Sequence, residues 1–278
     1  MTDGEGSHLW TPWRMAYVQH GAKETGCVFC NRLTGQDDVS SLILHRAERF
    51  FIIMNLYPYN TGHLMIVPNV HVATPEDAEP ETLAAIAAFT PNLLTAMRAS
   101  LHCDGFNLGT NVGSVAGAGI ATHLHEHVVP RWTGDANFMP VIAGTKVLPE
   151  MLPVTYAKLR AQLSPEKDQV TLAIVDKSET RVVVDERGGL PSIKPMANLS
   201  VWSSGVSAAE GLTGKKATIV GWAGDSLANG CAPALALTVV DPGAKNLAGD
   251  HHWVKTTEIW PDQASIVERA FNAATQTG

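Results

Sequence analysis

Apolar residues in the first half of the chain fall into short runs separated by turn-forming residues. Phe50–Met54 is wholly apolar, and His63–Pro68 follows after Asn-Leu-Tyr-Pro-Tyr-Asn-Thr-Gly. Tight turns need Pro, Asn and Gly, so the two runs predict a β-hairpin with its tip at 55–62. Residues 75–102 instead repeat apolar residues at helical spacing after an acidic start. They predict a helix that Pro91 breaks or kinks.

Two further stretches predict strands on either side of a glycine-rich loop. Residues 106–112 alternate apolar and polar side chains, and 123–129 carry a histidine at every second position before Val-Val. Alternate side chains of a strand share one face, so His123, His125 and His127 are expected to point the same way. The glycines between the strands allow the backbone to turn tightly and to approach a ligand closely.

A second domain is expected after a polar, proline-containing boundary at 164–169. Just before it, Met151–Leu163 carries an apolar stripe that predicts a closing helix. The predicted domains are 1–164 and 165–278, and each is large enough to bury its own core. In the second domain the predicted strands are Val170–Val175, Arg181–Glu186, Ala217–Ala223, Leu235–Val240 and Trp253–Ile259, and the predicted helix is Pro261–Ala274.

Composition narrows the class of protein. Hydrophobic residues make up 45% of the chain and charged residues 17%, which is typical of a globular protein. A net charge of −7 argues against a protein that coats nucleic acid, because that affinity depends on clustered Lys and Arg. Residues 1–6 show no secretory signal, and no apolar run approaches the roughly 18 residues of a membrane span. The four cysteines are too few for a disulfide framework, so we expect a reducing, cytoplasmic setting.

The amino-terminal region carries two patterns with more than one interpretation. The aromatic segment Leu9–Val18 favours packing of the terminus against the body, with contact to a ligand or partner subunit as the alternative. The spacing of Cys27 and Cys30 lets both thiolates face one ion, but a single such pair is ambiguous between zinc and redox chemistry. Histidines would have to complete a tetrahedral site, because the sequence has no second Cys-x-x-Cys.

The three alternating histidines are the strongest candidates for chemistry. A neutral imidazole can ligate a metal, attack an electrophile or transfer a proton near neutral pH. A glycine-rich loop directly before them supplies backbone N–H groups of the kind that bind phosphate. This combination favours a functional site over a chance cluster of surface histidines.

Several longer motifs lie within residues 9–163. They are Leu-Trp-Thr-Pro-Trp-Arg-Met, Cys-Val-Phe-Cys, Pro-Tyr-Asn-Thr-Gly-His-Leu-Met, and His-Leu-His-Glu-His-Val-Val-Pro-Arg-Trp followed by Gly-Asp-Ala-Asn-Phe. On these motifs the segment resembles the histidine triad (HIT) superfamily, and within it the ATP adenylyltransferase or diadenosine polyphosphate phosphorylase type. The resemblance implies an α+β fold with an antiparallel sheet, a twofold dimer and nucleotidyl transfer.

The resemblance also implies roles for individual residues. His125 would be the nucleophile that attacks the α-phosphorus of a nucleotide and gives a nucleotidyl-histidine intermediate. His127 would hydrogen-bond the phosphoryl oxygens or assist the leaving group. The substrate-binding residues that it implies are Asn55 for the ribose, and Asn111, Gly117 and Gly119 for the phosphate.

A metal site follows from the same resemblance. Family members with the Cys-x-x-Cys complete it with a histidine after the hairpin and the first histidine of the triad. The implied ligands are Cys27, Cys30, His71 and His123. Four protein ligands make a closed site, so the ion would be a structural Zn²⁺, with a redox pair as the alternative. Mg²⁺ is expected only as a companion of the nucleotide, and His63 is expected to be structural.

Two positions depart from the family pattern. Glu126 stands where members more often carry an apolar residue or Gln, and it should face away from the histidines toward Arg, Lys or solvent. Mycobacterial-type phosphorylases carry Gly-Ser seven and eight residues after the loop Asn. Counted from Asn111, this chain has Ala118 and Gly119 there. The acceptor therefore stays open between phosphate, water and another molecule.

The second domain faintly resembles a Nudix fold. If Gly214 is the glycine that ends the Nudix box, the metal-binding positions fall on Ala208, Gly211 and Leu212, and Glu210 is out of register. Without carboxylates there is no oxygen-rich Mg²⁺ site. We therefore expect a catalytically inactive domain that serves substrate binding or assembly.

These inferences describe a two-domain α+β enzyme that cleaves a nucleotide phosphoanhydride or related bond through His125. Diadenosine polyphosphates, nucleoside diphosphates and adenylyl sulfate are the first substrates to consider. We expect a homodimer or higher homo-oligomer, with neither a nucleic acid polymer nor a membrane as partner. The alternatives are a pathway-specific nucleotidyltransferase or phosphoramidate hydrolase and a non-catalytic nucleotide sensor, and the intact triad argues against the sensor.

Overall fold

The computed structural model describes residues 25–135, 150–226, 232–239 and 247–276. The aromatic segment Leu9–Val18 lies outside these residues. The chain divides into two compact units, one formed by Met1–Ala88 with Cys103–Met151 and the other by Phe89–His102 with Leu152–Gly278. The boundary between Met151 and Leu152 lies before the predicted closing helix, whereas the sequence analysis placed the domain boundary after that helix, at 164–169. The domain limits therefore stay a prediction.

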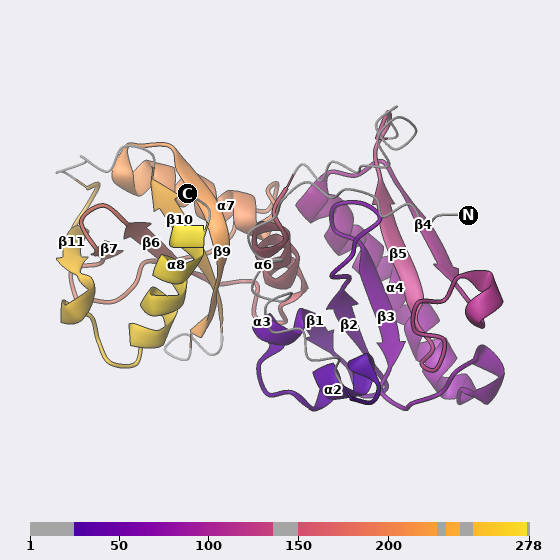
Figure 1. The fold of residues 1–278 in the computed structure, drawn as a ribbon. Coiled ribbons are helices and arrows are strands. Elements are labelled where there is room, and N and C mark those ends of the chain that lie inside the picture. Colours follow the sequence, from indigo (N-terminus) through magenta and orange to yellow (C-terminus); the bar gives the residue numbers. More distant parts are fainter. Residues whose placement is uncertain (1–24, 136–149, 227–231, 240–246, 277–278) are drawn as a thin grey trace, which may run out of the picture. The chain divides into compact units, whose positions relative to one another are not determined.

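A five-stranded antiparallel sheet forms the first unit, in the order β1-β2-β3-β5-β4 (Figure 1). The predicted hairpin is confirmed, because β2 and β3 pair with Phe50 opposite Pro68 and Met54 opposite Leu64. Both strands are buried along their whole length, which explains their continuous apolar runs. The strands are β1 (Ile43–Arg46), β2 (Phe50–Met54), β3 (Leu64–Pro68), β4 (Gly105–Thr110) and β5 (Glu126–Arg131).

The histidine stretch is only partly a strand. Because β5 begins at Glu126, His127 lies inside it, whereas His123, which lies in a bend, and His125 precede the strand. The expectation of one strand through all three histidines is therefore wrong. The cause is local, because this segment bonds outside the sheet: the Leu124 N–H donates to the Val72 carbonyl at 2.6 Å.

Helices and short 3₁₀ turns connect these strands. The predicted break at Pro91 is wrong, because a single helix, α4, runs through it. Proline costs a helix one hydrogen bond, and the remaining turns of a long helix tolerate that loss. None of the helices in the described ranges is long and apolar enough to cross a membrane. The elements are α2 (Val28–Thr34), α3 (Asp38–Ser41), η1 (Pro75–Asp77), α4 (Pro80–Leu101) and η2 (Ser114–Ala116).

The second unit contains a mixed sheet in the order β11-β7-β6-β10-β9, with β8 paired to β6. β6 and β10 are parallel and the other pairs are antiparallel. The strands are β6 (Val170–Asp176), β7 (Arg181–Val184), β8 (Ser192–Ile193), β9 (Ala217–Ser226), β10 (Ala232–Val239) and β11 (His252–Lys255). The helices are α6 (Leu152–Leu163), α7 (Val201–Thr213) and α8 (Ala264–Gln276), with the 3₁₀ turn η4 (Thr256–Glu258).

Helices α7 and α8 cover opposite faces of this sheet. Ala234 and Ala236 belong to the core that contains α8, whereas Leu235 between them meets Gly205 of α7. A β-carbon at Gly205 would lie 2.9 Å from the Leu235 side chain, so glycine permits this close approach. Helix α7 had no counterpart among the predicted elements. It nevertheless carries capping signals, a Ser200 N-cap and a left-handed Gly214 C-cap.

Candidate active site and metal centre

Two cysteines and two histidines gather at one end of the first sheet. One potential ligand atom from each of Cys27, Cys30, His71 and His123 lies within 4.8 Å of all the others. The Cys27 sulfur is 3.3 Å from Nδ1 of His123, and the Cys30 sulfur is 3.3 Å from Nδ1 of His71. Tetrahedral zinc with thiolate and imidazole ligands separates its donor atoms by about 3.3–3.8 Å. The four residues singled out from the sequence thus fit one tetrahedral divalent ion.

The surroundings of His123 prepare it for such a role. Its Nε2 lies 3.0 Å from the Pro68 carbonyl, which can only accept, so Nε2 carries the proton and Nδ1 keeps its lone pair toward the thiols. Burial lowers the pKa of His123 and favours the neutral ligand form. Burial, with the neighbouring Cys27, raises the pKa of the Cys30 thiol. A divalent cation would offset that effect by stabilising the thiolates.

His125 is the most deeply buried histidine at the cavity. It is 4% exposed, and its Nδ1 lies 2.8 Å from the carbonyl oxygen of His123. Because a carbonyl only accepts, Nδ1 carries the proton and Nε2 presents a lone pair. Burial also lowers the pKa of His125, which keeps the ring neutral at pH 7. These are the properties that a nucleophilic imidazole needs.

His63 orients the third histidine of the triad. Its Nδ1 accepts the Tyr59 N–H at 3.0 Å, so its Nε2–H donates to Nδ1 of His127 at 2.9 Å. His127 must then carry its own proton on Nε2, where it can be donated. Burial, and then the charge of His125, lower the pKa of His127. His63 was expected to be structural, and the contact was missed because only the strand register places it beside His127.

A cavity of about 420 Å³ opens beside His125 and His127. Asn55, Gly117 and Gly119 line it, whereas Asn111 is not among its lining residues, and the substrate-binding roles of all four stay predictions. Gly117 has φ +85°, a backbone conformation in which L side chains are strained. The loop therefore depends on glycine where it borders the cavity.

The side-chain carboxyl group of Glu126 has no hydrogen-bond or ion-pair partner among the described residues. It is half-buried in β5, opposite Ile66 on one side and Thr110 on the other. Burial raises the pKa of its carboxyl group. The expected Arg or Lys partner is therefore not found in the described part of the chain.

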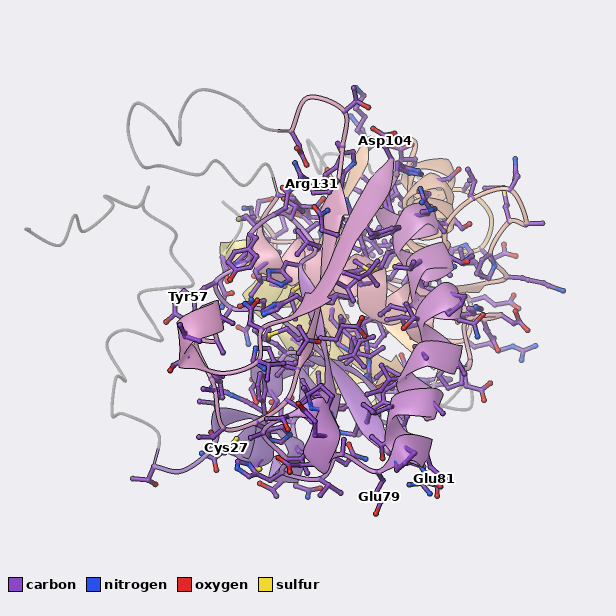
Figure 2. All side chains as sticks on the ribbon, turned by 90° about the vertical axis from the view of Figure 1, so that its right-hand side faces the viewer. Cys27, Tyr57, Glu79, Glu81, Asp104 and Arg131 are labelled. Carbon is purple, nitrogen blue, oxygen red and sulfur yellow. The ribbon has the colours of Figure 1, made fainter. Side chains whose placement is uncertain are left out.

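A polar cluster fastens the hairpin tip to the far end of β5. Arg131 binds both oxygens of Asp135 at 2.7 Å, and Asn60 donates to Asp135 at 2.8 Å and to the Pro130 carbonyl at 3.1 Å. The Arg131 hydrogen bond lowers the pKa of Asp135 to about 2. Figure 2 shows Arg131 at the opposite end of the sheet from Cys27. The group Cys27, Cys30, His71 and His123, called the metal-type cluster below, thus lies at the opposite end of the sheet from this polar cluster.

The fold and the histidine cluster together define a protein of the histidine triad class. A model of the HIT domain matches residues 36–134. The AP-4-A phosphorylase of Mycobacterium tuberculosis is 38% identical over 151 residues, which cover 52% of this chain and 77% of the relative. The chain belongs to the HIT family.

Two further proteins illustrate the range of similarity. Adenylylsulfatase HINT3 of Arabidopsis thaliana is 31% identical over 118 residues, which cover 42% of this chain and 58% of that protein. The crystal structure of a Zn-bound histidine triad family protein from Mycobacterium smegmatis is 32% identical, covers 50% of this chain and 93% of that chain, and superposes with a TM-score of 0.41.

Proposed function

We propose that the chain is a nucleotidyl-transferring enzyme that cleaves a nucleotide phosphoanhydride through His125. The observation that carries the proposal is the complementary protonation of two neighbouring rings. His125 offers an Nε2 lone pair and His127 offers an Nε2–H, with ring centroids 4.9 Å apart. Relatives named as a phosphorylase and an adenylylsulfatase support an enzymatic role.

The proposed reaction consists of two successive nucleophilic displacements at the α-phosphorus. Nε2 of His125 attacks the α-phosphorus while the bond to the leaving oxygen breaks, and His127 donates its Nε2 proton to that oxygen. An acceptor then attacks the phosphorus, transfers a proton to His127 and releases His125. Backbone N–H groups of the loop with Gly117 and Gly119 would stabilise the phosphoryl oxygens.

The acceptor and the pathway stay open within this proposal. Phosphate, water or a small molecule would give a phosphorylase, a hydrolase or a transferase, acting on a diadenosine polyphosphate, nucleoside diphosphate or adenylyl sulfate. A pathway-specific nucleotidyltransferase or phosphoramidate hydrolase would use the same two histidines. A nucleotide sensor would use the cavity without the covalent step.

We also propose that the cysteine and histidine cluster holds structural zinc. Cys27, Cys30, His71 and His123 would occupy all four positions, which leaves no open site for substrate. The ion would supply rigidity, because it would fix His123, whose carbonyl orients His125. Cysteines without disulfides are typical of a reducing compartment, which is consistent with the proposed cytoplasmic setting. Mg²⁺ stays a prediction tied to the nucleotide.

The second unit has a proposed supporting role. Of the positions that a Nudix box would use, Ala208, Gly211 and Leu212 of α7 carry no carboxylate. The nearby Glu210 accepts the Ala217 N–H at 3.2 Å, which is a structural contact. This supports a unit that serves substrate binding or assembly.

For the first unit we propose a homodimer. It would form through the exposed edge strand β4, where Leu108 is 43% exposed.

A trapping experiment tests the enzymatic proposal. The protein is incubated with labelled nucleotide, quenched and digested, and an acid-labile adduct is sought on the peptide that contains His125. His125→Asn is the matched control, because it keeps a polar side chain of similar shape. We expect the adduct on the parent protein alone. Absence of both adduct and turnover with phosphate, water and small-molecule acceptors would leave the sensor.

A further inference from the structure

The cavity extends well beyond the reacting histidines. Along one face of the sheet, His127 lies opposite Met65, Met65 opposite Ile53 and Ile53 opposite Ile43. Neighbouring strands are about 4.8 Å apart, so this row is about 14 Å long. The cavity follows it, because its lining includes His127, Met65, Ile53 and Leu42. That length accommodates a nucleoside whose phosphorus lies at His125.

Apolar side chains line the middle of this cavity. Phe29 of α2 lies with its ring centroid 5.1 Å from that of His125, and it borders the cavity together with Ile53 and Met65. All three are buried. Flat aromatic surfaces such as a nucleobase are stabilised between side chains of this kind. The base would therefore lie over Ile53 and Met65.

The end of the cavity away from the histidines is polar. Arg32 lies three residues after Phe29 on α2, one helical turn further along, and its Nη1 is 3.4 Å from the Ser40 carbonyl. Ser41 also lines the cavity and is 7% exposed. Its hydroxyl has no hydrogen-bond partner among the described residues. The Ser41 hydroxyl and the Arg32 guanidinium thus both border this part of the cavity, where a ligand with polar atoms could hydrogen-bond to them.

We propose that Arg32, supported by Ser41, selects 6-oxopurine nucleotides over adenine nucleotides. Arginine only donates hydrogen bonds, and its fork matches two adjacent acceptors. Guanine and hypoxanthine present such a pair, O6 and N7, on one edge. Adenine places an amino donor beside N7, so it offers the fork one acceptor and one competing donor. This inference rests on the proposed function, because it assumes that a nucleotide occupies the cavity.

Equilibrium binding of mononucleotides to the full chain tests the proposal. GMP, IMP and AMP are titrated into the parent protein and into Arg32→Lys, which keeps the charge but loses the fork. We expect GMP and IMP to bind at least about tenfold more tightly than AMP. In Arg32→Lys the ratio should fall close to one. IMP is the decisive probe, because it shares O6 and N7 with GMP and lacks the 2-amino group.

Two further variants make the test specific. Arg49→Lys is a matched control, because Arg49 pairs with Glu79 and does not line the cavity, and it should keep the parent ratio. Ser41→Ala should reduce the preference by about fivefold or less, as expected for one lost hydrogen bond. AMP affinity equal to that of GMP, or an unchanged ratio in Arg32→Lys, overturns the proposal. IMP binding as weakly as AMP also overturns it.

The two proposals fail in different ways. If none of the mononucleotides binds and no adduct forms at His125, the proposed function fails and the base preference fails with it. If the adduct forms with adenine and guanine nucleotides at equal rates, the proposed function stands. The role of Arg32 alone is then wrong.

Discussion

The carbonyl oxygen of His123 accepts the Nδ1–H of His125 at 2.8 Å. The same His123 directs its ring Nδ1 at the Cys27 sulfur, 3.3 Å away. One residue therefore joins the metal-type cluster to the proposed nucleophile, through its side chain on one side and its backbone on the other. Loss of order at the cluster should consequently reach the reaction centre.

Replacing a cysteine ligand tests this connection. We expect Cys27→Ser to lose most of its bound zinc, to unfold at a lower temperature and to form the His125 adduct more slowly, because His123 is no longer fixed. Metal content by mass spectrometry, thermal melting and adduct formation measure the three effects. Outer-sphere support of this kind typically changes activity by about 10–100-fold.

The control for that variant is Cys103→Ala, since Cys103 is a buried thiol outside the cluster. It should retain zinc while losing some stability through a small cavity. Equal zinc content in the parent protein and Cys27→Ser would show that the ligand assignment is wrong.

His63→Phe should slow turnover mainly through kcat. The variant removes the hydrogen bond that fixes the His127 proton on Nε2, and general acid catalysis typically contributes about 10²–10⁴-fold. Two substrates separate positioning from structural damage. An activated ester with a low-pKa leaving group needs no proton and should lose little, whereas a phosphoanhydride with a basic leaving group should lose most of its rate. Equal losses on both substrates would contradict the role of His63 in holding the His127 proton on Nε2.

Asp135 should make stability sensitive to acid. Its folded-state pKa of about 2 lies below the ordinary value of about 3.9, so the pairing with Arg131 stabilises the fold fully above about pH 4. That contribution is lost as the pH falls toward 2. Asp135→Asn should therefore melt about 2–4 °C lower than the parent at pH 7. The difference should shrink in acid, and a constant difference from pH 7 to 2.5 would rule out the carboxylate as its source.

Glu126 should show the opposite dependence on pH. Burial raises its pKa in the folded state, so the stability that the protonated carboxyl contributes is fully present below the ordinary Glu pKa and is lost as the pH rises through the folded-state pKa. Glu126→Gln should raise the melting temperature by a few degrees at pH 7.5 and have little effect at pH 4. The exposed Glu81 provides a matched control, and Glu81→Gln should give no such difference. A destabilised Glu126→Gln would indicate a carboxylate partner outside the described residues.

How much the sequence predicts depends on whether a feature is local. The β2–β3 hairpin was predicted because both strands are wholly apolar and their turn residues are distinctive. That Cys27, Cys30, His71 and His123 lie together was predicted through family resemblance, because the four residues belong to separate motifs. Helix α7 was missed because serine and glycine weaken its helical pattern.

Long-range contacts were harder to predict. The bond between His63 and His127 depends on strand register, and Arg32 reaches the cavity only through the placement of α2 against the sheet. The segment around Pro91 is helical although proline argued for a break, because tertiary packing outweighs a local preference. Side chains that meet across elements thus required the structure.

The length of strand β3 sets the distance between the metal-type cluster and the proposed catalytic histidines. Its carbonyl at Pro68 holds the ring of His123, while His63, immediately before Leu64, holds the ring of His127. Each added or deleted residue would flip one end of the strand to the opposite face. Inserting a single residue between Met65 and Ile66 should therefore separate the metal-type cluster from the hydrogen bond between His63 and His127, even though none of the proposed ligands and catalytic histidines is changed.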